Sequence, residues 1–348
     1  MKATILHGPY DVRCENVDDP EILTPRDAIV RVVAACVCGS DLWSYRGLNE
    51  FTTATAIGHE LVGVVEEVGP QVRSLKPGDF VISPFTISDN TCPHCRAGVQ
   101  TACRHLAYFG GKDSDGLPVG GAQAEFVRIP LADGTLVALR EHPDEAMIPA
   151  LLALADVMAT GWHAAISAGV AEGDTVVVVG DGAVGLLGVL SAARLGAERI
   201  VAMSRHPDRQ AVARRYGATD VITQRGAEGV ARVLELTDGV GAEAVLECVG
   251  TAESMDQAVG CARAGATVGF VGVPHGALPP IEPMFRRNVG LAGGMAPVRA
   301  YLPRLRDDVL AGVLDPGPVF DLELPLDRVT DGYAAMDTRS AIKSLLRP

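Results

Sequence analysis

The sequence is poor in aromatic residues and in positive charge, and it contains no long apolar run. Among 348 residues, 5% are aromatic, and 30 Lys and Arg stand against 43 Asp and Glu, giving a formal net charge of -13. Nucleic acids and anionic membrane surfaces bind through clustered Lys and Arg. We therefore expect no nucleic acid and no membrane as partner.

A membrane span and a secretory leader are also missing from the pattern. The most apolar stretch, residues 146–159, is broken by Pro149 and contains Asp156, so it falls short of the roughly 20 residues that a bilayer requires. Residues 1–9 lack the apolar run of a secretory signal. We expect a cytoplasmic protein. The length and the 48% hydrophobic content indicate about two globular domains.

Eight cysteines are present, and in a reducing compartment closely spaced cysteines indicate a metal site more often than disulfides. Cys92, Cys95 and Cys103 fall within twelve residues. They lie in an irregular segment, about residues 86–121, that is rich in Cys, Gly, Asp and His. A loop of this length is usually functional or is held by something other than a core.

Secondary-structure signals change character near residue 150. Before it, β-branched runs at 28–33, 61–68 and 79–82 predict strands separated by Gly and Pro turns. After it, strand and helix patterns alternate, which predicts βαβ units in a doubly wound parallel sheet and an α/β fold. The expected helices are 151–168, 184–195, 208–216 and 329–336, and the expected strands are 175–179, 199–203, 244–248 and 267–271.

A dinucleotide fingerprint follows the first of these buried strands. Gly180, Gly182 and Gly185, with Ala183 and Val184 between them, stand between an apolar strand and an apolar helix, as the G-x-G-x-x-G motif requires. The glycines permit a tight turn and a close approach of the backbone to a pyrophosphate. The helix N-terminus offers N–H donors to the phosphate oxygens.

The second strand of the unit predicts which cofactor binds. NAD sites place an Asp or Glu at its end to accept from the ribose 2′-OH. Here the strand ends in Ser204 and Arg205, with no carboxylate at that position. The hydroxyl can donate to a 2′-phosphate and the guanidinium can pair with it or stack over it. We therefore predict NADP(H) in preference to NAD(H).

One set of separated residues could form an open zinc site. Cys38, His59 and Asp156 provide a thiolate, an imidazole and a carboxylate, and three such ligands leave a fourth position for water or substrate. Zinc in an open site acts as a Lewis acid on an alcohol or carbonyl oxygen. The spacing alone does not bring these residues together.

A second set is local. The C-x2-C pair Cys92 and Cys95, with Cys103 eight residues further, supplies three thiolates of a closed tetrahedral site. Asp89, three residues before Cys92, is our candidate for the fourth ligand. His94 and His105 compete for this role, although His94 lies between two ligands, where binding would strain the loop.

Taken together, these residues resemble the zinc-dependent medium-chain alcohol dehydrogenase family over essentially the whole chain. The segment from Gly58 through His59 and Glu60 to Gly63, followed by Gly69 and Val72, matches the family signature G-H-E-x2-G-x5-G-x2-V. The segment from Asp156 to His163 resembles bacterial NADP-using secondary alcohol dehydrogenases, in which an Asp replaces a Cys ligand.

The resemblance implies a domain plan and a role for each matching residue. It implies a GroES-like catalytic domain, residues 1–152, that includes the structural-zinc lobe, a Rossmann domain over 153–296, and a C-terminal return to the catalytic domain over 297–348. The same resemblance implies that Cys38, His59 and Asp156 hold the catalytic zinc, that Glu60 can enter its coordination sphere, and that Ser40 takes the substrate's proton. Lys343 matches a basic residue that approaches the cofactor phosphates. The resemblance to bacterial members of this length also implies a homo-oligomer, a tetramer more than a dimer.

Two positions depart from the family pattern. The structural lobe usually carries four cysteines, and here Asp89 stands in place of the first. Many members have a His five residues after the first catalytic Cys as the outer end of a proton relay, whereas this chain has Trp43, which cannot accept a proton. The proton route beyond Ser40 is therefore open.

The expected activity is reversible hydride transfer between a primary or secondary alcohol and NADP(H), with one catalytic and one structural zinc per chain. One alternative is a polyol, sugar or amino-alcohol dehydrogenase on the same scaffold; the segments expected to line the pocket, Trp43, Tyr108–Phe109 and Met295, are mostly aromatic or apolar and favour simple alcohols. Another alternative is a non-catalytic NADP-binding protein that keeps only the structural zinc. The zinc content per chain distinguishes the enzyme from the binding protein, because the enzyme needs two zinc ions and the binding protein one.

Overall fold

The chain folds into two units that are built from different stretches of sequence. The computed structural model describes residues 1–49, 53–276 and 278–348. The first unit combines Met1–Asp156 with Pro297–Pro348, and the second is Val157–Ala296. This division places Asp156 in the first unit, whereas the sequence analysis assigned it to the second. Next to Asp156, the Ala155 carbonyl accepts a hydrogen bond from the Phe85 N–H of the first unit at 3.0 Å.

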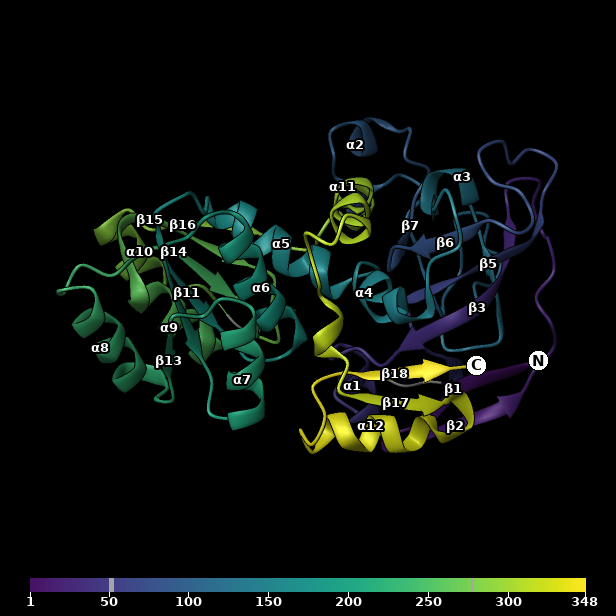
Figure 1. Ribbon diagram of the computed structural model, residues 1–348. Coiled ribbons are helices and arrows are strands. Elements are labelled where there is room, and N and C mark those ends of the chain that lie inside the picture. Colours follow the sequence, from purple (N-terminus) through teal and green to yellow (C-terminus); the bar gives the residue numbers. More distant parts are fainter. Residues whose placement is uncertain (50–52, 277) are drawn as a thin grey trace. The chain divides into compact units, whose positions relative to one another are not determined.

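The first unit is mainly β structure, organised around a seven-stranded sheet in the order β10-β6-β5-β3-β18-β17, with β9 also paired to β3 (Figure 1). A three-stranded sheet, β2-β1-β4, and the pair β7-β8 complete it. Its strands are β1 Lys2–Gly8, β2 Asp11–Asn16, β3 Ala28–Cys36, β4 Thr55–Ala56, β5 Leu61–Val68, β6 Phe80–Ser83, β7 Thr86–Ile87, β8 Ala107–Tyr108, β9 Phe126–Ile129, β10 Val137–Ala138, β17 Leu322–Pro325 and β18 Ser344–Arg347. Its helices are α1 Asp41–Tyr45, α2 Pro93–Arg96, α3 Ala132–Thr135, α4 Ile148–Ala153, α11 Val298–Leu310 and α12 Val329–Asp337, with 3-10 turns at Gln100–Ala102, Glu145–Met147, Gly317–Val319 and Leu326–Arg328.

Three strand ends of the large sheet meet at one place. Strands β5 and β18 both run antiparallel to β3, with Leu61 opposite Ala35 and Leu345 opposite Cys36. The residues that follow β3 and those that precede β5 and β18 are therefore neighbours. This arrangement brings the segments of Cys38, His59 and Lys343 to one edge of the sheet.

The second unit is a parallel six-stranded sheet in the order β13-β12-β11-β14-β15-β16 with helices on both faces (Figure 1). Strand β11 is a buried apolar run, as expected of a parallel sheet covered on both sides. The elements are α5 Val157–Ala168, β11 Thr175–Val179, α6 Ala183–Arg194, β12 Arg199–Met203, α7 Pro207–Arg215, β13 Asp220–Ile222, α8 Gly226–Leu236, β14 Ala242–Glu247, α9 Ala252–Cys261, β15 Ala262–Phe270, α10 Ile281–Arg287 and β16 Gly290–Gly293. The predicted α/β fold class is confirmed.

One predicted helix is wrong as a single element. The sequence pattern predicts a helix over residues 151–168, but α4 ends at Ala153 and α5 begins at Val157. Among the described residues, no single helix is long and apolar enough to cross a membrane, although α4 with its preceding turn and α5 together have the required length and composition as a bent pair. Asp156 lies in the break, where its side chain is not committed to a helix surface.

Candidate active site

Four side chains from three distant segments converge in the first unit. One possible ligand atom from each of Cys38, His59, Glu60 and Asp156 lies within 4.8 Å of those of the others. His59 Nε2 is 3.4 Å from Asp156 Oδ2, and Cys38 Sγ is 3.7 Å from the same oxygen. Cys38 follows β3, His59 and Glu60 precede β5, and Asp156 lies between α4 and α5. The structure thus brings together the residues that the sequence analysis selected for the catalytic zinc.

The electrostatics of this cluster favour a bound cation. Burial alone would lower the pKa of His59, but Asp41, Cys38 and Asp156 outweigh burial and hold that pKa well above its usual value. Burial, followed by the nearby Glu60, raises the pKa of the Cys38 thiol. Glu60 is fully buried, and its Oε2 has no hydrogen-bond partner among the described residues. Sulfur, nitrogen and oxygen donors around an excess of negative charge are a ligand set that suits zinc.

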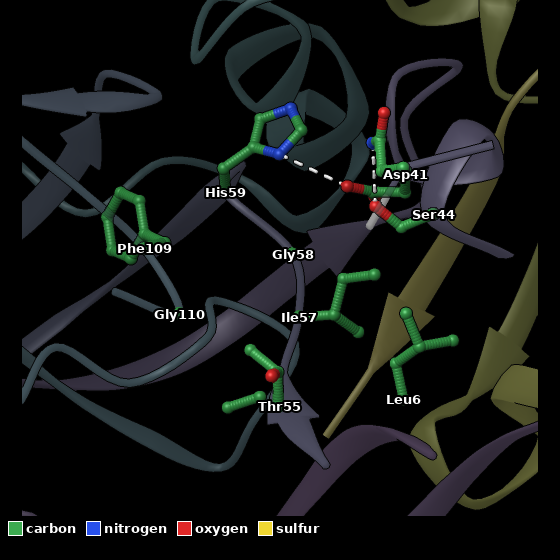
Figure 2. A pocket seen from close by; sticks show the side chains of 11 residues that line it. Leu6, Asp41, Ser44, Thr55, Ile57, Gly58, His59, Phe109 and Gly110 are labelled. Carbon is green, nitrogen blue, oxygen red and sulfur yellow. Dashed lines mark hydrogen bonds and ion pairs between the residues drawn. The ribbon is translucent and has the colours of Figure 1, made fainter. Parts of the chain in front are cut away.

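Asp41 orients the imidazole and was not selected from the sequence. Its Oδ1 lies 3.2 Å from His59 Nδ1 (Figure 2). Its Oδ2 accepts the Cys38 N–H at 2.9 Å. An acid on the far nitrogen of a metal-binding histidine fixes the tautomer and the ring orientation. The buried amide of Gln123 supports Asp41 by donating to Oδ2 at 3.3 Å and to the Cys36 carbonyl at 3.0 Å. The spacing of Asp41, three residues after Cys38, was the available signal.

Lys343 occupies an interior position that the sequence analysis did not anticipate. Its side chain is 1% exposed, and Nζ lies 2.7 Å from Glu60 Oε1 and 3.2 Å from the Val37 carbonyl. The lysine is thus the counter-charge of Glu60. A contact of Lys343 with cofactor phosphates stays a prediction.

A cavity of about 250 Å³ borders His59 on the Asp41 side (Figure 2). Its wall is partly apolar and partly polar, from Leu6, Asp41, Ser44, Asn49, Thr55, Ala56, Ile57, Gly58, His59, Phe109 and Gly110. Of the residues expected to line a pocket, Phe109 lines this one, whereas Trp43, Tyr108 and Met295 are not among the described residues of its wall. Cys38 and Asp156 also lie outside its wall.

The cysteine-rich segment forms a second cluster. Asp89, Cys92, Cys95 and Cys103 each place a possible ligand atom within 4.8 Å of the others. Cys92 Sγ lies 3.5 Å from Cys95 Sγ and 4.0 Å from Cys103 Sγ, and all eight cysteines are free thiols. The backbone N–H groups of Arg104 and Cys95 lower the pKa of Cys92 to about 7. Backbone donors that stabilise a thiolate fit a zinc-thiolate site.

Asp89 is organised for a ligand role. Its Oδ1 accepts the N–H groups of Thr91 and Cys92 at 2.8 and 2.9 Å, and its Oδ2 lies 2.8 Å from His105 Nδ1. Burial would raise its pKa, but these hydrogen bonds outweigh it and lower the pKa of Asp89. The carboxylate therefore stays charged beside the three thiols. His105 thus contacts the carboxylate of Asp89.

In the second unit, the fingerprint adopts the geometry of a phosphate cradle. Gly180 has a φ of +118°, which disfavours other residues, and a Cβ on Gly185 would lie 2.0 Å from the Gly180 carbonyl oxygen. A Cβ on Gly182 would meet nothing within 4 Å, so space is open beside the backbone. Gly182 is the N-cap of α6 and provides no side-chain cap. The first N–H groups of α6 are thus available to an anion, which fits a dinucleotide pyrophosphate.

Comparison with known proteins agrees with both units. Residues 24–141 match the alcohol dehydrogenase GroES-like domain, and residues 183–302 match the zinc-binding dehydrogenase domain. A probable zinc-binding alcohol dehydrogenase of Mycobacterium tuberculosis is 37% identical over all of this chain and 89% of its own length, and a zinc-type alcohol dehydrogenase B of Aspergillus flavus is 34% identical over all of this chain and 81% of its own. An NADP-dependent isopropanol dehydrogenase of Clostridium beijerinckii is 32% identical over 83% of each chain.

Solved structures give the same answer. The alcohol dehydrogenase TADH from Thermus sp. ATN1 superposes with a TM-score of 0.90 at 33% identity, covering 100% of this chain and 99% of its own. The two clusters of possible metal ligands and the dinucleotide fingerprint agree with these matches. The chain belongs to the zinc-dependent medium-chain alcohol dehydrogenase family and is an oxidoreductase of the zinc-type alcohol dehydrogenases.

Proposed function

We propose that this enzyme reversibly oxidises primary or secondary alcohols to aldehydes or ketones with NADP(H) in preference to NAD(H), and that each chain uses one catalytic and one structural zinc. The observation that carries the proposal is the convergence of Cys38, His59 and Asp156 beside the buried Glu60. Cys38, His59 and Asp156 would hold the catalytic ion, and Asp89 with the three cysteines of its lobe the structural one.

The residues of the site have separate tasks in this proposal. When bound, zinc supplies Lewis-acid polarisation of the substrate oxygen, and the nicotinamide supplies the hydride chemistry. Asp41 keeps the His59 ring turned, and Lys343 balances the charge of Glu60. Ser40 is half-buried at the N-cap of α1 and makes no cap hydrogen bond with its side chain, so its hydroxyl can accept the alcohol proton and pass it outward.

The preference for NADP(H) rests on the end of β12. Arg205 is exposed directly after the strand, and no acid stands among residues 204–207. The similarity to an NADP-dependent isopropanol dehydrogenase supports the same choice. The ratio of kcat/KM for the two cofactors decides it, and a clear NAD(H) preference would contradict it.

A homo-oligomer, a tetramer more than a dimer, completes the proposal. Strand β16 is the edge of the parallel sheet among the described strands, and Ile281 and Phe285 of the nearby α10 are 63% and 83% exposed. An open sheet edge beside exposed apolar side chains suits contact with a second copy. Light scattering of the purified chain measures the assembly.

The central test is removal of a predicted zinc ligand. We expect Cys38→Ser and His59→Ala to lose turnover by at least about a thousandfold, since the ion contributes directly to barrier lowering. Binding of the cofactor, measured by calorimetry, should change little. Cys14→Ser is the matched control, because Cys14 lies on β2 outside both clusters. Full activity in zinc-free protein would refute the proposal.

A polyol or amino-alcohol substrate is the second candidate, favoured by the polar part of the cavity wall. Ser44, Asn49 and Thr55 present hydroxyl and amide groups there, with Asn49 Nδ2 donating to Ser44 Oγ at 3.0 Å. A substrate screen that compares 2-butanol with 2,3-butanediol separates the two classes. A strong preference for the diol would favour the second candidate.

A further inference from the structure

A carboxylate from the glycine fingerprint, Asp181, lies beside Ser204, the residue at the end of β12 where cofactor choice is predicted. In the parallel sheet, Val179 at the end of β11 is paired with Met203 at the end of β12. The residues that follow these two strands are therefore neighbours. Asp181, inside the glycine fingerprint, lies beside Ser204, and Ser204 Oγ donates to Asp181 Oδ2 at 2.8 Å. Both residues are buried, with exposures of 7% and 2%.

This hydrogen bond determines what Ser204 can offer a ligand. A hydroxyl has a single proton, and the proton of Ser204 is already donated to the carboxylate. A 2′-phosphate dianion has only acceptor oxygens, so it would have to compete with the Asp181 carboxylate for the proton of Ser204. A ribose 2′-OH can instead donate to Ser204 Oγ or to the Asp181 carboxylate. The hydrogen-bonding chemistry of this pair thus favours an unphosphorylated ribose.

The charges around the pair are mixed. Arg209 of α7 lies with Nη1 3.6 Å from Asp181 Oδ1 and donates to the Asp181 carbonyl at 3.1 Å, so it partly neutralises the acid. Arg205 is exposed at the end of β12 and favours a phosphate. A carboxylate next to the 2′ position repels the 2′-phosphate of NADP(H) and accepts a hydrogen bond from the 2′-hydroxyl of NAD(H). It therefore disfavours NADP(H) relative to NAD(H).

We propose that Asp181 is a specificity-determining residue that disfavours binding of the 2′-phosphate. The enzyme therefore uses NAD(H) as well as NADP(H). The size of its preference for NADP(H) depends on the repulsion of the 2′-phosphate by Asp181 and its attraction by Arg205. The inference rests on the proposed cofactor site at the fingerprint. Ser204 acts in it as an acceptor and as the partner that holds Asp181 in place.

The test is Asp181→Asn, which removes the charge and keeps the size. Isothermal titration calorimetry with adenosine 2′,5′-bisphosphate and with 5′-AMP compares two ligands that differ only in the 2′-phosphate. We expect the ratio of their affinities to rise at least about fivefold in favour of the bisphosphate, or about 1 kcal/mol. A smaller rise, or a shift toward 5′-AMP, overturns the proposal.

Asp220→Asn is the matched control, because it neutralises a carboxylate at the opposite end of the neighbouring β13, beside Arg199. It should leave the ratio within about twofold. If Asp181→Asn does not fold, Asp181→Ala removes the same charge and is held to the same threshold. The measurement is nucleotide binding, so this proposal can fail independently of the proposed function. If the wild type does not oxidise alcohols but Asp181→Asn shifts the affinity ratio, only the proposed function is refuted. If the wild type oxidises alcohols but the ratio does not shift, only the role of Asp181 is refuted.

Discussion

Several buried charges of this protein are compensated by side chains of opposite charge from distant segments of the chain. Lys343 balances Glu60 at the zinc cluster, and Arg128 of β9 lies between two acids, with Nε 2.6 Å from Asp27 and Nη2 2.6 Å from Asp113. All three side chains of the Arg128 group are at most 5% exposed. A buried charge that loses its partner is strongly destabilising.

We therefore expect Arg128→Met to lower the free energy of unfolding by about 3–5 kcal/mol, because Asp27 and Asp113 would stay buried without a cation. Denaturant unfolding measures the change. Arg31→Met is the control: Arg31 is exposed on β3 and lies 3.6 Å from the exposed Glu66, so its loss should stay within about 0.5 kcal/mol. Equal losses in the two variants would contradict a structural role for the buried group.

The same group predicts a pH dependence. Burial would raise the pKa of Asp113, but the hydrogen bonds from Arg128, Leu117 and Asp115 outweigh it and lower that pKa. A lowered pKa contributes stability that is present above the unfolded value of about 3.9 and is lost as the pH falls through the folded one. Wild-type stability should thus fall more steeply below about pH 4 than that of Arg128→Met. Parallel acid titrations of the two proteins would contradict this.

Helices and strands approach so closely in the second unit that glycine is required at the contacts. A Cβ at Gly161 of α5 would lie 2.7 Å from the Gly188 nitrogen of α6, and one at Gly269 of β15 would lie 2.0 Å from the Ala164 carbonyl oxygen. Gly185 has the same role between α6 and the turn that follows β11. The fingerprint glycines thus divide into Gly185, which packs against backbone, and Gly182, beside which the space is open.

Two glycine variants separate these roles. Gly185→Ala should destabilise the protein by about 1–3 kcal/mol, because the new methyl group meets the backbone of Gly180. Gly182→Ala meets nothing in the protein and should keep its thermal stability, yet bind cofactor at least about tenfold more weakly. Thermal unfolding and calorimetry measure the pair. Weak binding without a loss of stability in Gly185→Ala would contradict the packing role.

In the molecule as a whole, the lobe around residues 86–121 contributes only small apolar clusters. Cys92, Cys95 and Cys103 pack with Leu106, and Ile87, Ala107 and Val119 pack with Leu131 and Phe109, while the larger cores lie in the sheets. A segment with so few apolar contacts depends on another stabilising interaction, and a structural zinc contributes folding free energy directly.

Loss of the oxygen ligand should therefore be visible in the metal content. After dialysis against a chelator, we expect the wild type to keep about two zinc ions per chain and Asp89→Ala about one, with a lower melting temperature. Asp115→Ala, in an exposed turn of the same lobe, is the control. Equal zinc retention in Asp89→Ala and Asp115→Ala would exclude Asp89 as a ligand.

Local sequence patterns predict the features that depend on a few neighbouring residues. The fingerprint between strand and helix, the C-x2-C lobe and the strand runs near 28, 61 and 175 could all be read without a structure, because turn chemistry and hydrophobic periodicity act over a few residues. The family signature around His59 then supplied the expected partners. The resemblance also singled out Asp156 as the ligand among the many acids of the chain.

Only the tertiary structure decided how distant polar groups pair. The antiparallel register of β3 with β5 and β18 brings Lys343 onto Glu60, the turn after β3 places Asp41 on His59, and the parallel register of β11 with β12 brings Asp181 onto Ser204. These contacts join residues whose spacing in the sequence follows neither the helical nor the strand periodicity, so no local pattern predicts them. Burial makes each pairing obligatory, because a charged or polar group removed from water needs a partner, and the fold determines which one is within reach.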